Sequence, residues 1–191
     1  MGMANVQSQV KVLKAVLALA VLVYSAAPEL LQAADENPFK SAKVGDWVEF
    51  KQATQMAAGN MEATMKQTVT AKDEKTVTLK MEVSANGMKP PPQEVKIELD
   101  KPYDPTQTPE NAKIEKLKEG DETITAGGKE YKCHWVQSKV TVDHEGTKFE
   151  TESKSWISKD APLGGLVKME MEIKAMGTKT LMELTGSGKG Q

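Results

Sequence analysis

The chain has 191 residues, a formal net charge of −2 and one cysteine, and all of its basic residues other than the histidines are lysines. The absence of arginine removes the forked donor that reads guanine edges and clamps phosphates, which argues against nucleic-acid binding. The lone Cys133 cannot form an internal disulfide, and His134 and His144 lack the spacing of metal ligands. We therefore expect no nucleic-acid partner, no metal and no cofactor.

The first 34 residues have the pattern of a secretory signal peptide. Lys11 and Lys14 precede an uncharged apolar run over residues 15–24, which is well short of the roughly 20 residues that a spanning helix needs. We expect cleavage just after Ala34 and no stable membrane span afterwards, with a permanent anchor as the alternative. The protein is thus predicted to be periplasmic or secreted. Its expected parts are a signal peptide over residues 1–34, one domain over residues 35–185 and a disordered tail over residues 186–191.

From Val44 onward, apolar and polar residues alternate, which is typical of strands with one buried face. In the first half the expected strands are residues 47–56, 61–70, 76–83 and 94–99. The loop AAGN between the first two strands places Phe50 opposite Gln67 if all four of its residues lie outside the ladder. The proline-rich segment over residues 86–93 breaks the pattern and is expected to be a surface loop.

The second half continues this pattern, with expected strands at residues 121–125, 129–142, 147–158, 167–175 and 178–184. Residues 109–118 could form either a helix or an irregular strand, and we favour the strand because the neighbouring elements are strands. Together these elements predict a mainly β fold. We expect a single curved antiparallel sheet of about nine to ten strands in largely meander order, forming a half-barrel or a barrel with few short helices.

Aromatic residues gather on one face of the predicted hairpin over residues 129–158. A four-residue loop at its tip would place Cys133 opposite Trp156. The resulting aromatic cluster contains Tyr131, Cys133, Trp135 and Trp156, and a structural role in fixing the register is favoured over a ligand role. Cys133 and His134 are neighbours on a strand and point to opposite faces, so they cannot act there as a nucleophile and its base. We therefore expect no enzymatic activity.

Methionine is the unusual component, with 11 copies against three phenylalanines. Unbranched, polarisable side chains fill irregular gaps and adapt to varied apolar partners. The sequence contains no clear long amphipathic helix to cover the apolar face of the sheet, and a large uncovered apolar surface is typical of a ligand or partner site. A methionine-rich core that binds nothing is the alternative, and both remain open at this point. The candidate ligand-binding residues on this face are Phe50, Met65, Leu79, Met81, Val167, Met169, Met171 and Met182.

The segments GGKEYKCHWV, KSWIS and APLGGLVKMEMEI resemble those of secreted bacterial proteins without assigned function. The overall layout is similar to the lipoprotein-carrier fold of the LolA/LolB type, although the chain lacks arginine and the helices that plug the barrel of those carriers. The resemblance implies a half-open antiparallel barrel over an apolar cavity and a periplasmic or cell-surface binder of acyl chains. The predicted function is an exported, non-enzymatic binder of a lipid or acyl chain. The alternative is a structural or protein-interaction module of the cell envelope, with a protein partner and a closed, dry core.

Overall fold

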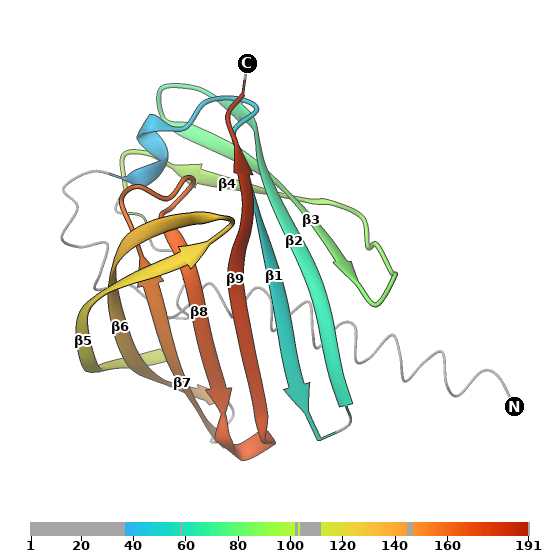
Figure 1. Cartoon of the computed structure of the whole chain (residues 1–191), viewed down its shortest axis with the longest axis vertical. Helices are drawn as coiled ribbons and strands as arrows, with labels where there is room; N and C mark the ends of the chain where they lie inside the picture. The colour runs from blue at the N-terminus through green and yellow to red at the C-terminus, as the bar shows by residue number, and fades with distance from the viewer. Residues whose placement is uncertain (1–36, 58, 102, 104–111, 145–146, 191) are drawn as a thin grey trace, which may run out of the picture.

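The computed structural model of the chain describes residues 37–57, 59–101, 103, 112–144 and 147–190. Its described part holds nine strands in one sheet and two short 3-10 helices (Figure 1), which confirms the prediction of a mainly β fold. The expected signal peptide lies outside the described residues. The strands are β1 (Trp47–Met56), β2 (Gly59–Lys72), β3 (Thr76–Ala85), β4 (Gln93–Glu98), β5 (Ala112–Ala126), β6 (Lys129–His144), β7 (Thr147–Ile157), β8 (Leu166–Ile173) and β9 (Thr178–Gly188), and the helices are η2 (Pro38–Ser41) and η3 (Lys174–Met176).

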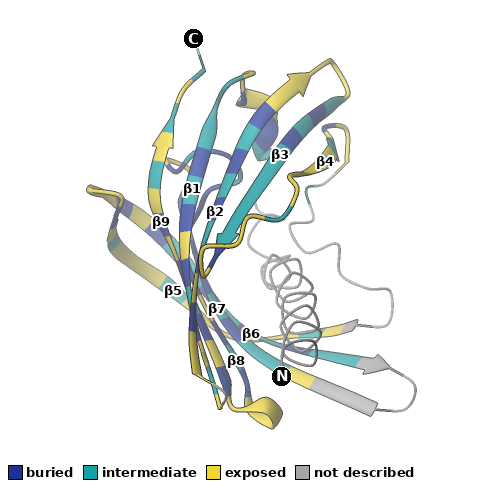
Figure 2. Cartoon of the chain, turned by 90° about the vertical axis from the view of Figure 1, so that its right-hand side faces the viewer, coloured by how far each residue is buried: buried dark blue, intermediate teal, exposed yellow. Residues whose placement is uncertain are grey.

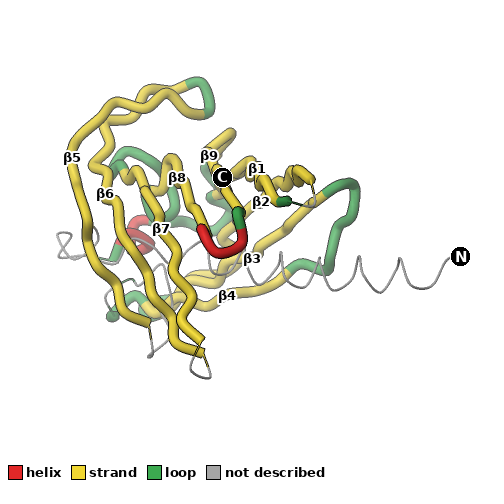
Figure 3. The backbone as a smooth tube through the Cα atoms, turned by 90° about the horizontal axis from the view of Figure 1, so that it is seen from below, coloured by secondary structure: helices red, strands yellow, loops and turns green. Residues whose placement is uncertain are grey.

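The sheet is an antiparallel meander whose first and last strands are joined in its middle. The strand order is β4-β3-β2-β1-β9-β8-β7-β6-β5, and β1 pairs with both β2 and β9. Strands β4 and β5 follow each other in the chain yet form the two edges of the sheet, so the described strands do not close into a barrel. The sheet curls strongly along its width (Figure 3). Of the two predicted shapes, the open half-barrel is therefore the one observed.

The alternation of residue types explains which face of each strand is buried. In β1, Val48 and Phe50 are buried while Lys51 and Gln55 are exposed. In β8, Met169 and Met171 are buried and Glu170 between them is exposed. Because successive side chains on a strand point to opposite faces, each strand contributes one row to the inner, concave face of the sheet and one row to its outer face. Burial is concentrated along the middle of the sheet (Figure 2).

Two hairpins turn more tightly than the sequence predicted. Strands β1 and β2 are separated only by residues 57–58, so Phe50 pairs with Met65 and the expected pairing with Gln67 is wrong. In the hairpin of β6 and β7, Trp135 lies opposite Trp156, and the expected pairing of Cys133 with Trp156 is also wrong. Both registers are displaced by two residues. Such a shift leaves every side chain on its predicted face, so the period-two pattern cannot detect it.

The structure shows that most of residues 109–118, for which the sequence allowed a helix or a strand, belong to strand β5. Residues 112–118 belong to the strand, which carries a bulge between Lys116 and Lys118 and leaves Leu117 40% exposed. Ile114 and Leu117 are three residues apart, as on a helical turn, but they lie on a strand that the bulge makes irregular. Residues 109–111 lie outside the described residues. At the other end of the chain β9 continues to Gly188, past residue 186 where the sequence predicted a disordered tail.

One end of the half-barrel, here called the cap end, is covered by η2 and by the loop over residues 158–165. Phe39 of η2 is fully buried and packs edge-on against Tyr103, with 4.8 Å between the ring centroids. Leu163 adopts a left-handed φ of 44° and is buried in the core. At Gly165 a Cβ atom would lie 2.9 Å from the carbonyl oxygen of Ser158, so this tight loop requires glycine there.

Candidate functional site

The inner face of the sheet brings the eight predicted ligand-binding residues into one apolar cluster. Seven of them are buried members of the core, and Met81 is half-buried against it. Met169 pairs with Met182 across β8 and β9, and Phe50 pairs with Met65 across β1 and β2, which places these residues on a common face. The full set is Phe50, Met65, Leu79, Met81, Val167, Met169, Met171 and Met182. Their role in ligand binding stays a prediction.

The inner face also carries buried polar side chains that the sequence analysis did not identify as a group. They come from β1, β2, β6, β7 and β9, and none is charged: Gln52, Thr54, Gln67, Ser138, Ser153, Ser155, Thr178 and Thr180. The residue pairings give their orientation, because Ser153 lies opposite Met171 and Ser155 lies opposite Met169. Each of these two serines of β7 thus lies directly beside a methionine of β8.

Hydrogen bonding divides this polar group into two parts. The Gln52 amide donates to Thr54 Oγ1 at 3.2 Å, and Thr54 Oγ1 lies 3.2 Å from Thr180 Oγ1, which links β1 to β9. By contrast, the Oγ atoms of Ser153 and Ser155 are buried and have no hydrogen-bond partner in the structure. A buried hydroxyl without a partner costs about 1–3 kcal/mol of stability. The two serines are therefore the polar groups of the inner face that a ligand would satisfy.

The cap end contains a cavity of about 1120 Å³. Its walls come from η2, from the C-terminal part of β5, from the N-terminal part of β6 and from the loop over residues 158–165. Ile157 and Leu163 supply apolar surface, while Lys132, His134 and Asp121 supply polar surface. A cavity of this size with mixed walls is of the kind that accepts a small ligand. None of the eight predicted residues of the inner face is among the residues that line it.

The predicted aromatic cluster lies on the outer face, where the hairpin of β5 and β6 folds across β8 and β9 (Figure 1). Lys154 Nζ lies 4.0 Å from the ring centroid of Trp135 and 4.4 Å from that of Trp156. Trp156 Nε1 donates to Glu122 Oε2 at 2.8 Å, and a Cβ atom on Gly120 would touch the Trp135 ring at 2.9 Å. The contacts of Lys154 and Trp156 join β7 to the hairpin, whereas the contact of Gly120 with Trp135 lies within it. The predicted structural role of the cluster stays a prediction.

Cys133 and Tyr131 are buried members of this cluster, and Cys133 also lies in the wall of the cap-end cavity. Cys133 is 2% exposed, and its Sγ donates a long hydrogen bond of 3.5 Å to the Tyr131 carbonyl oxygen. Burial raises the pKa of the Cys133 thiol, and the charge of Glu122 raises it further. Burial likewise raises the pKa of the Tyr131 hydroxyl. A thiol held in its neutral form is a poor nucleophile.

His134 lies on the opposite face of β6 from Cys133 and contacts two carboxylates there. Its Nδ1 lies 2.9 Å from Asp121 Oδ1, and its Nε2 lies 3.4 Å from Glu119 Oε2. Both partners come from β5, and Glu119 also forms an ion pair with Lys116. The imidazole therefore links β5 to β6 and has no contact with the thiol that would make the two a catalytic pair.

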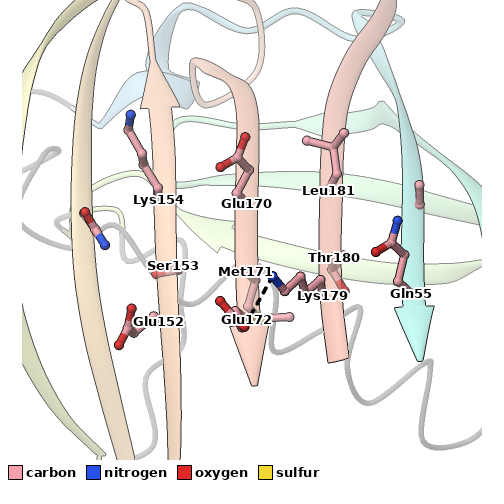
Figure 4. Close-up of a pocket in the computed structure, with 12 residues that line it drawn as sticks. Gln55, Glu152, Ser153, Lys154, Glu170, Met171, Glu172, Lys179, Thr180 and Leu181 are labelled. Carbon is pink, nitrogen blue, oxygen red and sulfur yellow. Dashed lines mark ion pairs between the residues drawn. The ribbon is translucent and has the colours of Figure 1, made fainter. Parts of the chain in front are cut away.

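A shallow groove of about 380 Å³ crosses the outer face of β1, β9, β8 and β7 (Figure 4). Lys154, Glu170, Leu181 and Gln55 project from the strands around it. Most of the charged residues along it are paired within the chain: Lys179 pairs with Glu172, and Glu170 pairs with Lys168 of the same strand. The groove is thus lined mainly by charged and polar side chains, in contrast to the inner face of the same strands.

Within the described residues, the structure contains no cluster of three or more His, Cys, Asp or Glu side chains arranged to hold a metal ion. The helices of this described part are also too short and too polar for any of them to cross a membrane.

Comparison with known proteins finds similarity only in structure, because no family model and no curated protein matches the chain. The chain is similar to a predicted exported protein with a YmcC-like fold from Bacteroides fragilis, with a TM-score of 0.51 and 9% identity over 78% of this chain and 97% of the other. It is also similar to a predicted lipoprotein from Parabacteroides distasonis, with a TM-score of 0.47 and 12% identity over 76% and 96% of the two chains. A predicted outer membrane lipoprotein-sorting protein domain from Vibrio parahaemolyticus gives a TM-score of 0.33 and 10% identity over 85% and 90%. The expected resemblance to exported bacterial proteins is confirmed at the level of the fold.

Proposed function

We propose that the protein is an exported, non-enzymatic protein of the periplasm or cell exterior that holds a lipid or other apolar ligand against the inner face of its sheet. The observation that carries this proposal is the gathering of methionines from β2, β3, β8 and β9 into one cluster inside an open half-barrel. Flexible thioether side chains adapt to ligands of different shape better than branched aliphatic side chains do. The shared fold with an exported protein supports the location.

The chemistry of the described side chains supports a binding role over a catalytic one. Catalysis would need an activated nucleophile or a base beside an open site. Cys133 is buried with a raised pKa, and His134 is engaged by the carboxylates of Asp121 and Glu119. The alternative function, an envelope interaction module with a closed, dry core, fits less well, because β4 and β5 remain unpaired edges among the described strands.

Extraction of the protein purified from its natural envelope tests the proposal. Organic extraction followed by mass spectrometry should recover a lipid from the wild-type protein. The double substitution Met169→Lys with Met171→Lys places two ammonium groups on the inner face of β8 and should abolish loading. The matched control is Glu170→Lys with Glu172→Lys, which introduces the same side chains on the outer face of the same strand and should load normally.

A milder substitution covers the case in which the double variant does not fold. Met81→Lys changes a half-buried residue of β3, near the β4 edge, where the lysine stem can lie on apolar surface while its charge reaches water. It should keep its strand content by circular dichroism and load less lipid than the wild type. Clean spectra from the wild-type protein, or equal loading of Met81→Lys, would count against ligand binding on this face.

A further inference from the structure

Ser153 and Ser155 of β7 form the one pair of buried hydroxyls on the described inner face whose oxygen atoms have no hydrogen-bond partner. They are 3% and 0% exposed, respectively. The nearby Gln52, Thr54 and Thr180 satisfy one another, so the lack of partners is confined to β7. A hydroxyl in such a position carries an unused donor that a bound acceptor would engage.

The neighbours of the two serines are apolar or neutral. On β8 they face Met171 and Met169, and on β6 they face Ser138 and Val136. A ligand that reached the hydroxyls would therefore lie with its apolar part along the methionines. Two residues of the same face of one strand are about 7 Å apart, so each hydroxyl can serve a separate acceptor atom.

The charges around the pair favour a neutral acceptor over an anion. The buried polar residues of the inner face include no lysine, histidine or carboxylate. His134 lies on this face of β6, opposite Ile157, and it is bound by the carboxylates of Asp121 and Glu119. Lys116 of β5 lies beyond β6 and is paired with Glu119. A carboxylate placed at the serines would be a buried charge without a partner, which is strongly unfavourable.

We propose that Ser153 and Ser155 form a subsite for the ester carbonyl groups of a neutral acyl lipid whose hydrocarbon chain lies along Met169, Met171 and Met182. The hydroxyls donate to the carbonyl oxygens, and the methionines surround the chain. This inference rests on the proposed function and adds the class of ligand to it. It selects a neutral acyl ester over a free fatty acid and over a plain hydrocarbon of equal length.

A competition experiment on the purified protein tests the subsite. A hydrophobic fluorescent probe, N-phenyl-1-naphthylamine, is bound first and displaced by methyl dodecanoate, by dodecanoic acid at neutral pH or by dodecane. The wild-type protein should bind methyl dodecanoate about tenfold more tightly than dodecane, as expected for one net hydrogen bond in a dry site. It should bind the ionised acid more weakly than the ester.

The double substitution Ser153→Ala with Ser155→Ala should remove the preference for the ester and leave the affinity for dodecane unchanged. The matched control is Ser84→Ala on the outer face of β3, which should keep the preference. A variant that still prefers the ester overturns the subsite, as does a wild-type protein that binds ester and alkane equally or the acid best, and ligand binding itself survives these results. Failure of all three compounds to displace the probe overturns the proposed function and the subsite together.

Discussion

The two faces of β7 differ in whether their polar side chains have interaction partners. On the outer face, Lys154 lies between the rings of Trp135 and Trp156, and the Trp156 indole donates to Glu122. On the inner face, Ser153 and Ser155 are buried with no partner for their hydroxyls. The polar side chains on the outer face of this strand therefore have partners within the protein, whereas the two buried hydroxyls on its inner face have none.

This difference indicates that a ligand would bind to the inner face of the sheet and not to its outer groove. The charged residues along the outer groove of about 380 Å³ are largely paired within the chain, so a partner there would have to replace existing ion pairs. The inner face instead combines adaptable methionines with unused donors. Since native proteins leave few buried polar groups unpaired, the exceptions are informative about function.

The largest expected effect comes from removing apolar volume from the inner face. Phe50→Ala deletes a ring that is 1% exposed and belongs to the core, and it should lower the free energy of unfolding by about 3–5 kcal/mol. The neighbouring Lys51→Ala on the outer face removes an exposed ion pair with Glu62 and should change it by less than about 1 kcal/mol. Urea denaturation with a common slope measures both values. Similar losses in the two variants would mean that the inner face is not the core.

An intermediate effect is expected from the contacts that dock the β5 and β6 hairpin. Trp156→Phe keeps an aromatic ring but removes the hydrogen bond to Glu122, and it should lower the free energy of unfolding by about 1 kcal/mol. In a double-mutant cycle with Glu122→Gln, most of that loss should appear as coupling between the two residues. Loading of an apolar ligand should not change, because the indole lies on the outer face. A loss of loading in Trp156→Phe would contradict the separation of the two faces.

The sequence predicted the faces of the strands better than their partners. Alternation placed the methionines and the aromatic cluster correctly by face, because a two-residue shift in register leaves the period-two pattern intact. It did not predict that β1 pairs with β9, since nothing local in either strand encodes a contact between the two ends of the domain. The sequence did not predict the burial of the two serines because these positions of β7 are polar, whereas a buried face is recognised by its apolar residues. The only indication was that Ser153 and Ser155 alternate in step with Ile157, and their burial follows from the pairing with β8.

The smallest expected effect is the contribution of the outer cluster to the pH dependence of stability at alkaline pH. Burial raises the pKa of the Cys133 thiol above its ordinary 9.0 and that of the Tyr131 hydroxyl above 10.0. The unfolded chain therefore loses these protons at lower pH than the folded protein does, so their contribution to stability is full below the ordinary values and is lost as the pH rises through the raised ones. Cys133→Ala should make the fall in melting temperature between about pH 8 and about pH 10 shallower, whereas Ser155→Ala on the inner face should leave its slope unchanged. An unaltered slope in Cys133→Ala would show that burial does not keep this thiol in its neutral form in the folded protein.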